Sequence, residues 1–230
     1  MTNVSLLLGA DNEIYIDQSG ATSNLDIEQV GGSGNIIGGS DATAGSSNMT
    51  PLDLDGATMT LDILQKGSTN KFLGDIWADN YTGYFSFIGD TNTFNMSTDE
   101  TNATGADGSN VNVQVTGNTN TMTLNHAMTA LAANLDLDWI IQGGGNSITA
   151  SIDVDGATNY MDIDGSDNTV TYDGDGYAGG YFYLDHTGGS RTFNIDQEST
   201  SDNDWLKITS VGSNGTVCVT QSDSTTSFVC

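Results

Sequence analysis

The chain alternates apolar and polar residues in short runs along nearly its whole length. The segment NEIYIDQSGATSNLDIEQ, residues 12–29, contains the pattern twice, and a glutamine closes each half at Gln18 and Gln29. Alternation with a period of two residues predicts β-strands that bury one face. Clusters of Gly, Ser, Asn and Asp separate the runs and predict the turns between strands.

The same short strand recurs later in the chain. The sequence reads NEIYIDQ, SNLDIEQ, MTLDILQ, RTFNIDQ and GTVCVTQ, with glutamines at Gln18, Gln29, Gln65, Gln197 and Gln221. Residues that open strands are separated by 23 and 23 positions, and then by 22, 23 and 24, in the two series Asn12, Asn35, Thr58 and Asn146, Asn168, Arg191, Gly215. Two strands with their turns therefore form one unit of about 22–24 residues.

These periods predict an all-β fold, a single-stack β-solenoid (β-helix) with two short strands per rung. The alternative is a β-sandwich, because short strands separated by frequent turn signals also suit that architecture. In a solenoid, identical side chains on successive rungs lie about 4.8 Å apart, and inward amides can hydrogen-bond as a ladder. We predict such an amide ladder from Asn12, Gln18, Gln29, Gln65, Gln197 and Gln221.

The repeat is interrupted in three places. Residues 38–51 and 95–109 predict loops that leave the solenoid, and residues 124–137 have the only helix-like composition. We expect N-terminal rungs over residues 1–123, an irregular ledge over 124–137, and C-terminal rungs with an end cap over 138–230.

Composition fits a thin core that is repeated many times. Of the 230 residues only 36% are hydrophobic, and 30 acidic residues against four basic ones give a net charge of −26. This charge disfavours nucleic acid and anionic membranes as partners. The first residues have neither a basic segment nor a long apolar run, so no signal peptide is expected. No stretch is long and apolar enough for a membrane span.

Residues 12–29 resemble the curlin repeat of bacterial curli fibres. The matching pattern is Asn12-x5-Gln18-x-Gly20-x2-Ser23-x5-Gln29. The resemblance implies a β-solenoid with two strands per rung, whose copies stack end to end into extracellular fibres. Later echoes occur at Gln65-x-Gly67, Gln197 and Gln221.

Pairs of aspartates that precede a glycine, or lie near one, raise the question of calcium. Carboxylates and backbone carbonyls at turns can supply oxygen ligands, although the EF-hand spacing is missing. The other interpretation is that Asp-Gly forms turns and that the aspartates lie on the solvent face. The residues concerned are Asp53, Asp55, Asp153, Asp155, Asp162 and Asp164.

Enzyme chemistry has little support in the sequence. Pairs of carboxylates are uninformative in a chain this acidic, and neither a phosphate loop nor a nucleophile elbow occurs. His126 and His186 have no ligand spacing around them and are expected to be ordinary surface or turn residues. We expect no enzymatic activity and, calcium apart, no cofactor.

Aromatic residues gather in two segments. Alternation in YFSFIG and YFYLDH predicts that some rings fill the core and others face outward. The outward rings could bind surface glycans or a neighbouring subunit, or they could simply cap wide rungs. The residues are Trp77, Tyr81, Tyr84, Phe85, Phe87, Tyr172, Tyr177, Tyr181, Phe182 and Tyr183.

Cys218 and Cys230 are the only cysteines and lie twelve residues apart, which is half a rung. Two consecutive strands would bring them together, so we predict a disulfide that caps the C-terminal rung and stabilises it by roughly 3 kcal/mol. Two buried thiols are the alternative.

These features predict a non-catalytic structural protein that works by shape and self-association. A phage virion component is expected, such as a capsid decoration protein, a head fibre or a tail-associated fibre, whose partners are virion proteins or further copies. The alternatives are an exported curlin-like fibre or matrix subunit and a glycan-binding or depolymerising spike. The expected location is the virion or the extracellular space.

Overall fold

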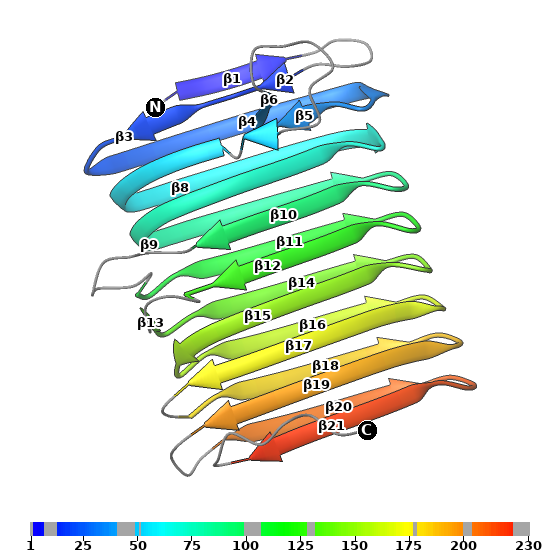
Figure 1. Ribbon diagram of the computed structural model, residues 1–230. Helices are drawn as coiled ribbons and strands as arrows, with labels where there is room; N and C mark the ends of the chain where they lie inside the picture. Colours follow the sequence, from blue (N-terminus) through cyan, green and yellow to red (C-terminus); the bar gives the residue numbers. More distant parts are fainter. Residues whose placement is uncertain are drawn as a thin grey trace.

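The computed structural model describes residues 2–6, 13–40, 49–50, 52–98, 107–127, 132–176, 179–199 and 204–222. Nineteen strands join in one sheet that coils upon itself, as predicted for a solenoid (Figure 1). Among the described residues there is no helix with the length and apolar character needed to cross a membrane.

The coil has two faces, which we call face 1 and face 2. Face 1 consists of β1 (Thr2–Leu6), β4 (Thr22–Ser33), the second halves of β8 (Leu52–Ser68) and β9 (Lys71–Ile88), β11 (Asn110–Thr116), β14 (Asp136–Gln142), β16 (Thr158–Asp164), β18 (Tyr181–Thr187) and β20 (Trp205–Val211). Face 2 consists of β2 (Glu13–Ile14), β3 (Asp17–Ser19), β5 (Ile36–Ile37), the first halves of β8 and β9, β10 (Thr93–Thr98), β12 (Thr121–His126), β15 (Ser147–Asp155), β17 (Asn168–Gly176), β19 (Arg191–Ser199) and β21 (Thr216–Ser222). The short strand β13 (Ala132–Ala133) pairs with β15.

Every pair in the large sheet is parallel, and each strand pairs with the strand of the next rung on the same face. A β-sandwich is built from antiparallel pairs, so the sandwich alternative is wrong. The only antiparallel pair among the described residues joins β6 (Gly39–Ser40) to β7 (Met49–Thr50), inside the segment predicted as the loop 38–51.

The register gives the length of each rung directly. Asp138, Tyr160, Tyr183 and Lys207 stack in one column and are 22, 23 and 24 positions apart. The step grows to 36 between Asp26 and Asp62, whose rung contains residues 38–51. It is 28 and 26 for the rungs that contain residues 95–109 and 124–137.

Strands continue through parts of the interruptions. β10 runs to Thr98 and covers the first four residues of the segment predicted as a loop, and residues 99–106 lie outside the described part. Across residues 124–137 the sheet is unbroken, since β11 pairs with β14 and β12 with β15. Of this segment, residues 128–131 lie outside the described part.

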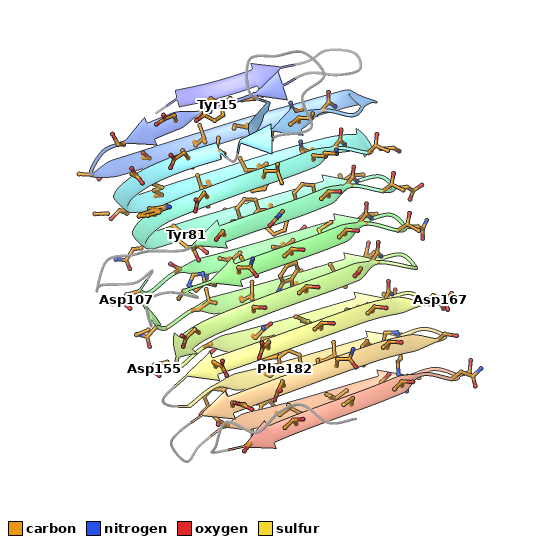
Figure 2. The ribbon with its side chains drawn as sticks, in the orientation of Figure 1. Tyr15, Tyr81, Asp107, Asp155, Asp167 and Phe182 are labelled. Atoms are coloured by element: carbon orange, nitrogen blue, oxygen red, sulfur yellow. The ribbon has the colours of Figure 1, made fainter. Side chains whose placement is uncertain are left out.

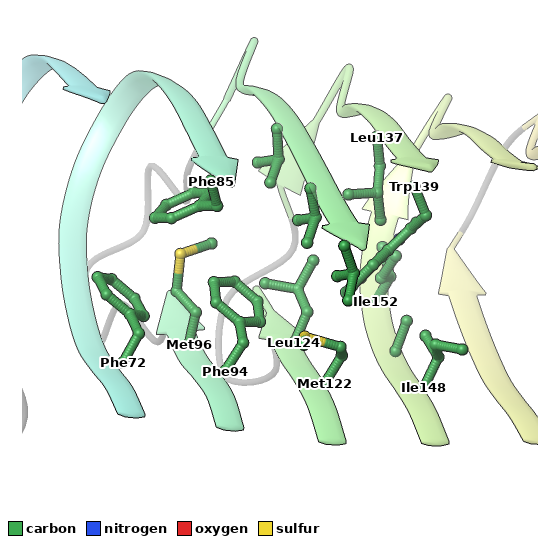
Figure 3. Packing of buried hydrophobic residues seen from close by; sticks show 14 of the residues in the cluster. Phe72, Phe85, Phe94, Met96, Met122, Leu124, Leu137, Trp139, Ile148 and Ile152 are labelled. Atoms are coloured by element: carbon green, nitrogen blue, oxygen red, sulfur yellow. The ribbon is translucent and has the colours of Figure 1, made fainter. Parts of the chain in front are cut away.

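The core lies between the two faces and is one side chain thick on each (Figure 3). Phe85 from face 1 packs edge-on against Phe72 and Phe94 from face 2, with ring centroids 5.2 and 5.1 Å away. Trp139 from face 1 reaches Phe94 at 6.3 Å. Burying such side chains contributes about 1.5–3 kcal/mol each, so the stack gains stability with every rung.

The two edges of the coil differ. At the turn edge, from β9 onward, face 1 strands lead into face 2 through turns of three or four residues; at the loop edge, face 2 strands lead back into face 1 (Figure 1). Figure 2 shows Asp167 at the turn edge, and Asp107 and Asp155 at the loop edge.

Candidate functional surfaces

The turn edge carries a column of buried asparagines. Each follows a turn residue with positive φ, such as Thr91 (59°), Thr119 (57°) and Asp167 (62°), and each opens or directly precedes a face 2 strand. All are at most 1% exposed: Asn35, Asn70, Asn92, Asn120, Asn146 and Asn168.

Each asparagine from Asn35 to Asn146 bonds to the asparagine of the next rung. The backbone N–H of Asn92 donates to Oδ1 of Asn120 at 2.7 Å, and the N–H of Asn120 donates to Oδ1 of Asn146 at 2.8 Å. The side-chain amide of Asn120 donates to the same Asn146 oxygen at 3.1 Å. The sequence signal for this ladder is a repeated Gly-x-x-Asn turn, which the pattern of glutamines does not reveal.

The glutamines predicted as a ladder divide between two columns. On face 1, Gln65 Nε2 donates to Gln29 Oε1 at 2.7 Å, and both side chains are buried. On face 2, Gln197 stacks on Gln221, and Gln18 lies in the same column but next to Leu54. Asn12 lies outside the described residues.

Carboxylates also form columns, mainly near the loop edge of face 2. Asp153 stacks on Asp175, which stacks on Glu198, and beside them Asp173 stacks on Asp196. Desolvation raises the pKa of Asp173 above its usual value, and the charges of Asp175 and Glu198 raise it further. Parallel in-register stacking therefore places like charges next to each other.

The aspartates considered for calcium do not converge. Asp53 and Asp55 lie on β8, Asp153 and Asp155 on β15, and the third pair on β16 on the other face, namely Asp162 and Asp164. Within the described ranges, no three carboxylate, imidazole or thiol groups come close enough to hold a metal ion. Desolvation, with the charges of Asp55 and Asp17, raises the pKa of Asp53.

Both histidines are buried, so their assignment as surface or turn residues is wrong. Nδ1 of His126 lies 3.0 Å from the Tyr81 hydroxyl and 2.7 Å from Oγ1 of Thr98, and burial raises the pKa of Tyr81 above its usual range. His186 contacts Ser210 and the Gly165 carbonyl at 3.0 and 3.1 Å. The alternation places both inward, which residue type alone did not indicate.

Four aromatic side chains form an exposed group on the outer side of face 1, which we call the aromatic strip: Tyr160, Tyr181, Tyr183 and Trp205. Tyr183 is parallel to Tyr160 within 5° at 5.1 Å, and parallel to Trp205 within 7° at 6.4 Å. Lys207 Nζ lies over the Tyr183 ring, 4.8 Å from its centroid. Sequence reasoning missed Tyr160 and Trp205, because only the register brings them to this surface.

The other aromatics follow the predicted alternation. Tyr84 and Tyr181 are 49% and 51% exposed, whereas Phe85 and Phe182 are buried. Tyr177 lies outside the described residues.

A shallow hollow of about 210 Å³ lies on the same face as the aromatic strip. It is lined by residues of β14, β16 and β18, among them Gln142, Asp164 and Thr187, which form one column. Asp162 also lines it and stands between the hollow and the strip.

Cys218 is buried in β21, with 4% of its surface exposed. Cys230 lies outside the described residues, so the disulfide between them stays a prediction.

Comparison of the chain with protein-family models, with curated proteins and with solved structures found no match. The repeat β-solenoid rests on the structure itself, and the likeness to curlin repeats rests on the sequence pattern.

Proposed function

We propose that the protein is a non-catalytic structural protein, a stiff rod that works as part of a larger assembly. The most specific form of the proposal is a phage virion component: a capsid decoration protein, a head fibre or a tail-associated fibre. The observation that carries it is the unbroken in-register stack that joins face 1 from β1 to β20. Such a stack resists bending because every rung is tied to its neighbours.

Buried polar groups in the described core support a structural role. The asparagine column, the Gln29–Gln65 pair and the Tyr81–His126 contact all use their hydrogen bonds to join one rung to another. A buried polar group costs stability unless it finds a partner, and here the partner is the next rung. These groups therefore serve cohesion.

The C-terminal end of the stack supports assembly through ends. Val217 and Val219 of β21 occupy inward columns and are 44% and 42% exposed, whereas Phe193 and Ile195 directly beneath them are fully buried. Among the described residues β21 pairs only with β19, and a strand edge with apolar inward positions is a ready docking surface. The chain as a whole has a net charge of −26, so copies repel each other when they approach side by side.

The experiment is mass spectrometry and immunogold labelling of purified virus particles and of a cell-surface fibre fraction from the same culture. The proposal expects the chain in particles at constant stoichiometry. Its presence in surface fibres and absence from particles would overturn the virion assignment in favour of an exported curlin-like fibre subunit.

A variant pair tests the docking end. Val217→Lys combined with Val219→Lys should abolish incorporation into the assembly, because two charges would enter the apolar contact. Val211→Lys is the matched control, since Val211 is 63% exposed on β20 of the same rung but in an outward column. If the double variant were incorporated as well as the Val211→Lys control, this end of the stack would have no docking role.

A further inference from the structure

From the aromatic strip and the adjoining hollow, we infer that the outer side of face 1 over β14–β20 binds a neutral polysaccharide of pyranose sugars. This goes beyond the structural role, and it holds whether the rod belongs to a virion or to a fibre.

Three of the four rings keep part of their surface open, and Tyr183 lies between Tyr160 and Trp205. Stacked carbon atoms touch at about 3.5–4.0 Å, so centroids 5.1 Å apart in parallel rings mean that Tyr160 and Tyr183 are offset sideways. Tyr160, Tyr181 and Trp205 accordingly remain 36%, 51% and 45% exposed. The apolar C–H face of a pyranose carries a weak positive potential and packs on the negative face of such a ring.

Hydrogen-bonding groups lie beside the rings, two residues further along the same strands. Asp162 and Asp185 stack in the outward column next to Tyr160 and Tyr183, and the Tyr183 hydroxyl donates to Asp185 at 3.4 Å. Beyond them lies the hollow, lined in part by Gln142 and Thr187. Carboxylates accept hydrogen bonds from sugar hydroxyls, while the amide and the hydroxyl both donate and accept.

The charge of this face selects a neutral ligand. Asp138, Asp162, Asp164 and Asp185 lie around the strip, and Lys207 is already engaged with the Tyr183 ring. An anionic glycan would be repelled by these carboxylates.

The strip is too small for a stable protein partner. Three rings that are 36%, 51% and 45% exposed, with the partly buried Tyr183, offer at most roughly 300 Å², whereas a stable protein interface takes about 800 Å² from each partner. A single glycan chain needs only a few such stacking positions with polar groups beside them.

The test measures binding of cellohexaose, chitohexaose and mannohexaose to the full chain by calorimetry. At least one hexasaccharide should bind, and Tyr181→Ala and Trp205→Ala should each weaken it roughly tenfold. Tyr84→Ala is the matched control: Tyr84 is 49% exposed on the same face, and in its column Asn112 and Asp138 separate it from Tyr160. It should bind as the parent chain does.

A second variant tests the charge selection. Asp162→Asn with Asp185→Asn keeps acceptors and removes two charges, so binding of the neutral hexasaccharide should persist while polygalacturonate, which the parent chain rejects, begins to bind.

Three outcomes would overturn the inference. These are no binding by any hexasaccharide, binding that Tyr181→Ala and Trp205→Ala leave unchanged, and binding of oligolysine alone, which would make the face a surface for basic peptides. Because purified chain suffices, a negative result here leaves the virion and fibre experiments unaffected.

Discussion

The turn edge and the loop edge of the solenoid obey the same geometry with opposite results. At the turn edge the stacked residues are amides, which bond from rung to rung. Near the loop edge of face 2 they are carboxylates such as Asp153 and Asp196, whose pKa is raised by desolvation and further by the charges of their neighbours. In-register parallel stacking therefore multiplies whatever chemistry a position carries.

The number of residues that connect the strands also differs between the turn edge and the loop edge. From β9 onward every turn at the turn edge keeps three or four residues between strands, whereas the longer rungs gain their extra residues elsewhere. Each asparagine of the column must lie level with its partner on the next rung. A turn that contains such an asparagine therefore cannot accept an insertion. Substitutions at the two edges distinguish the bonding between stacked amides from the repulsion between stacked carboxylates.

The largest effect is expected at the glycines that open these turns. A Cβ added at Gly117 would overlap the carbonyl oxygen of Gly89 on the rung before, and Gly117 has a φ of +141°. Gly117→Ala should cost about 3 kcal/mol, measured as a shift in the denaturant midpoint. Gly20→Ala is the control, because nothing lies within 4 Å of a Cβ there. Equal midpoints would show that stacked turns do not constrain the chain.

The asparagine column should give the next largest effect. Asn120→Ala leaves the buried N–H of Asn92 without its acceptor, which costs about 2 kcal/mol. Asn95→Ala removes an exposed asparagine from the neighbouring strand β10 and should change stability by less than about 0.5 kcal/mol. If thermal melts showed the same loss in both variants, the ladder would contribute nothing beyond a surface amide.

Sequence alone predicted the parts of this fold that depend on local pattern. Alternation gave the inward positions, and the spacing of Asn146, Asn168 and Arg191 gave the rung length. It did not predict the asparagine ladder, because an asparagine bonds to a residue 22–35 positions away and insertions change that distance. For the same reason the aromatic residues predicted from the sequence did not include Tyr160 and Trp205. Both are isolated in sequence and meet Tyr183 only through the register of the strands.

Removing a charge from a carboxylate column should raise stability, whereas removing an amide from the asparagine column should lower it. Because the pKa of Asp173 is raised in the folded state, its stabilising contribution is complete below the unfolded value of about 3.9 and is lost as pH rises through the folded pKa. At pH 7, Asp173→Asn should raise stability by about 0.5–1 kcal/mol, with a smaller gain at pH 4.

Glu28→Gln is the control for this variant, since Glu28 is exposed and stacks on Leu64 rather than on an acid. A melting temperature of Asp173→Asn that fell at pH 7, or that rose equally at both pH values, would contradict repulsion between stacked carboxylates.

His186 should give the smallest effect, and its sign is the reverse of the carboxylates'. Desolvation lowers the pKa of His186, and Arg191 lowers it further, against the raising effects of the Gly165 carbonyl, Asp164 and Asp185. The neutral ring is held between Ser210 and Gly165 near the turn edge. Its contribution is therefore complete above the unfolded pKa of about 6.5 and is lost as pH falls toward the folded value.

Between pH 7.5 and 5.5 the parent chain should lose about 2 °C in melting temperature through this group. His186→Gln keeps a polar side chain without a titrating ring, so its melting temperature should change less over the same interval. The difference between the two slopes isolates the contribution of His186, because the carboxylates are common to both chains. If the slopes were identical, His186 would take up its proton in the folded rod as readily as in the unfolded chain.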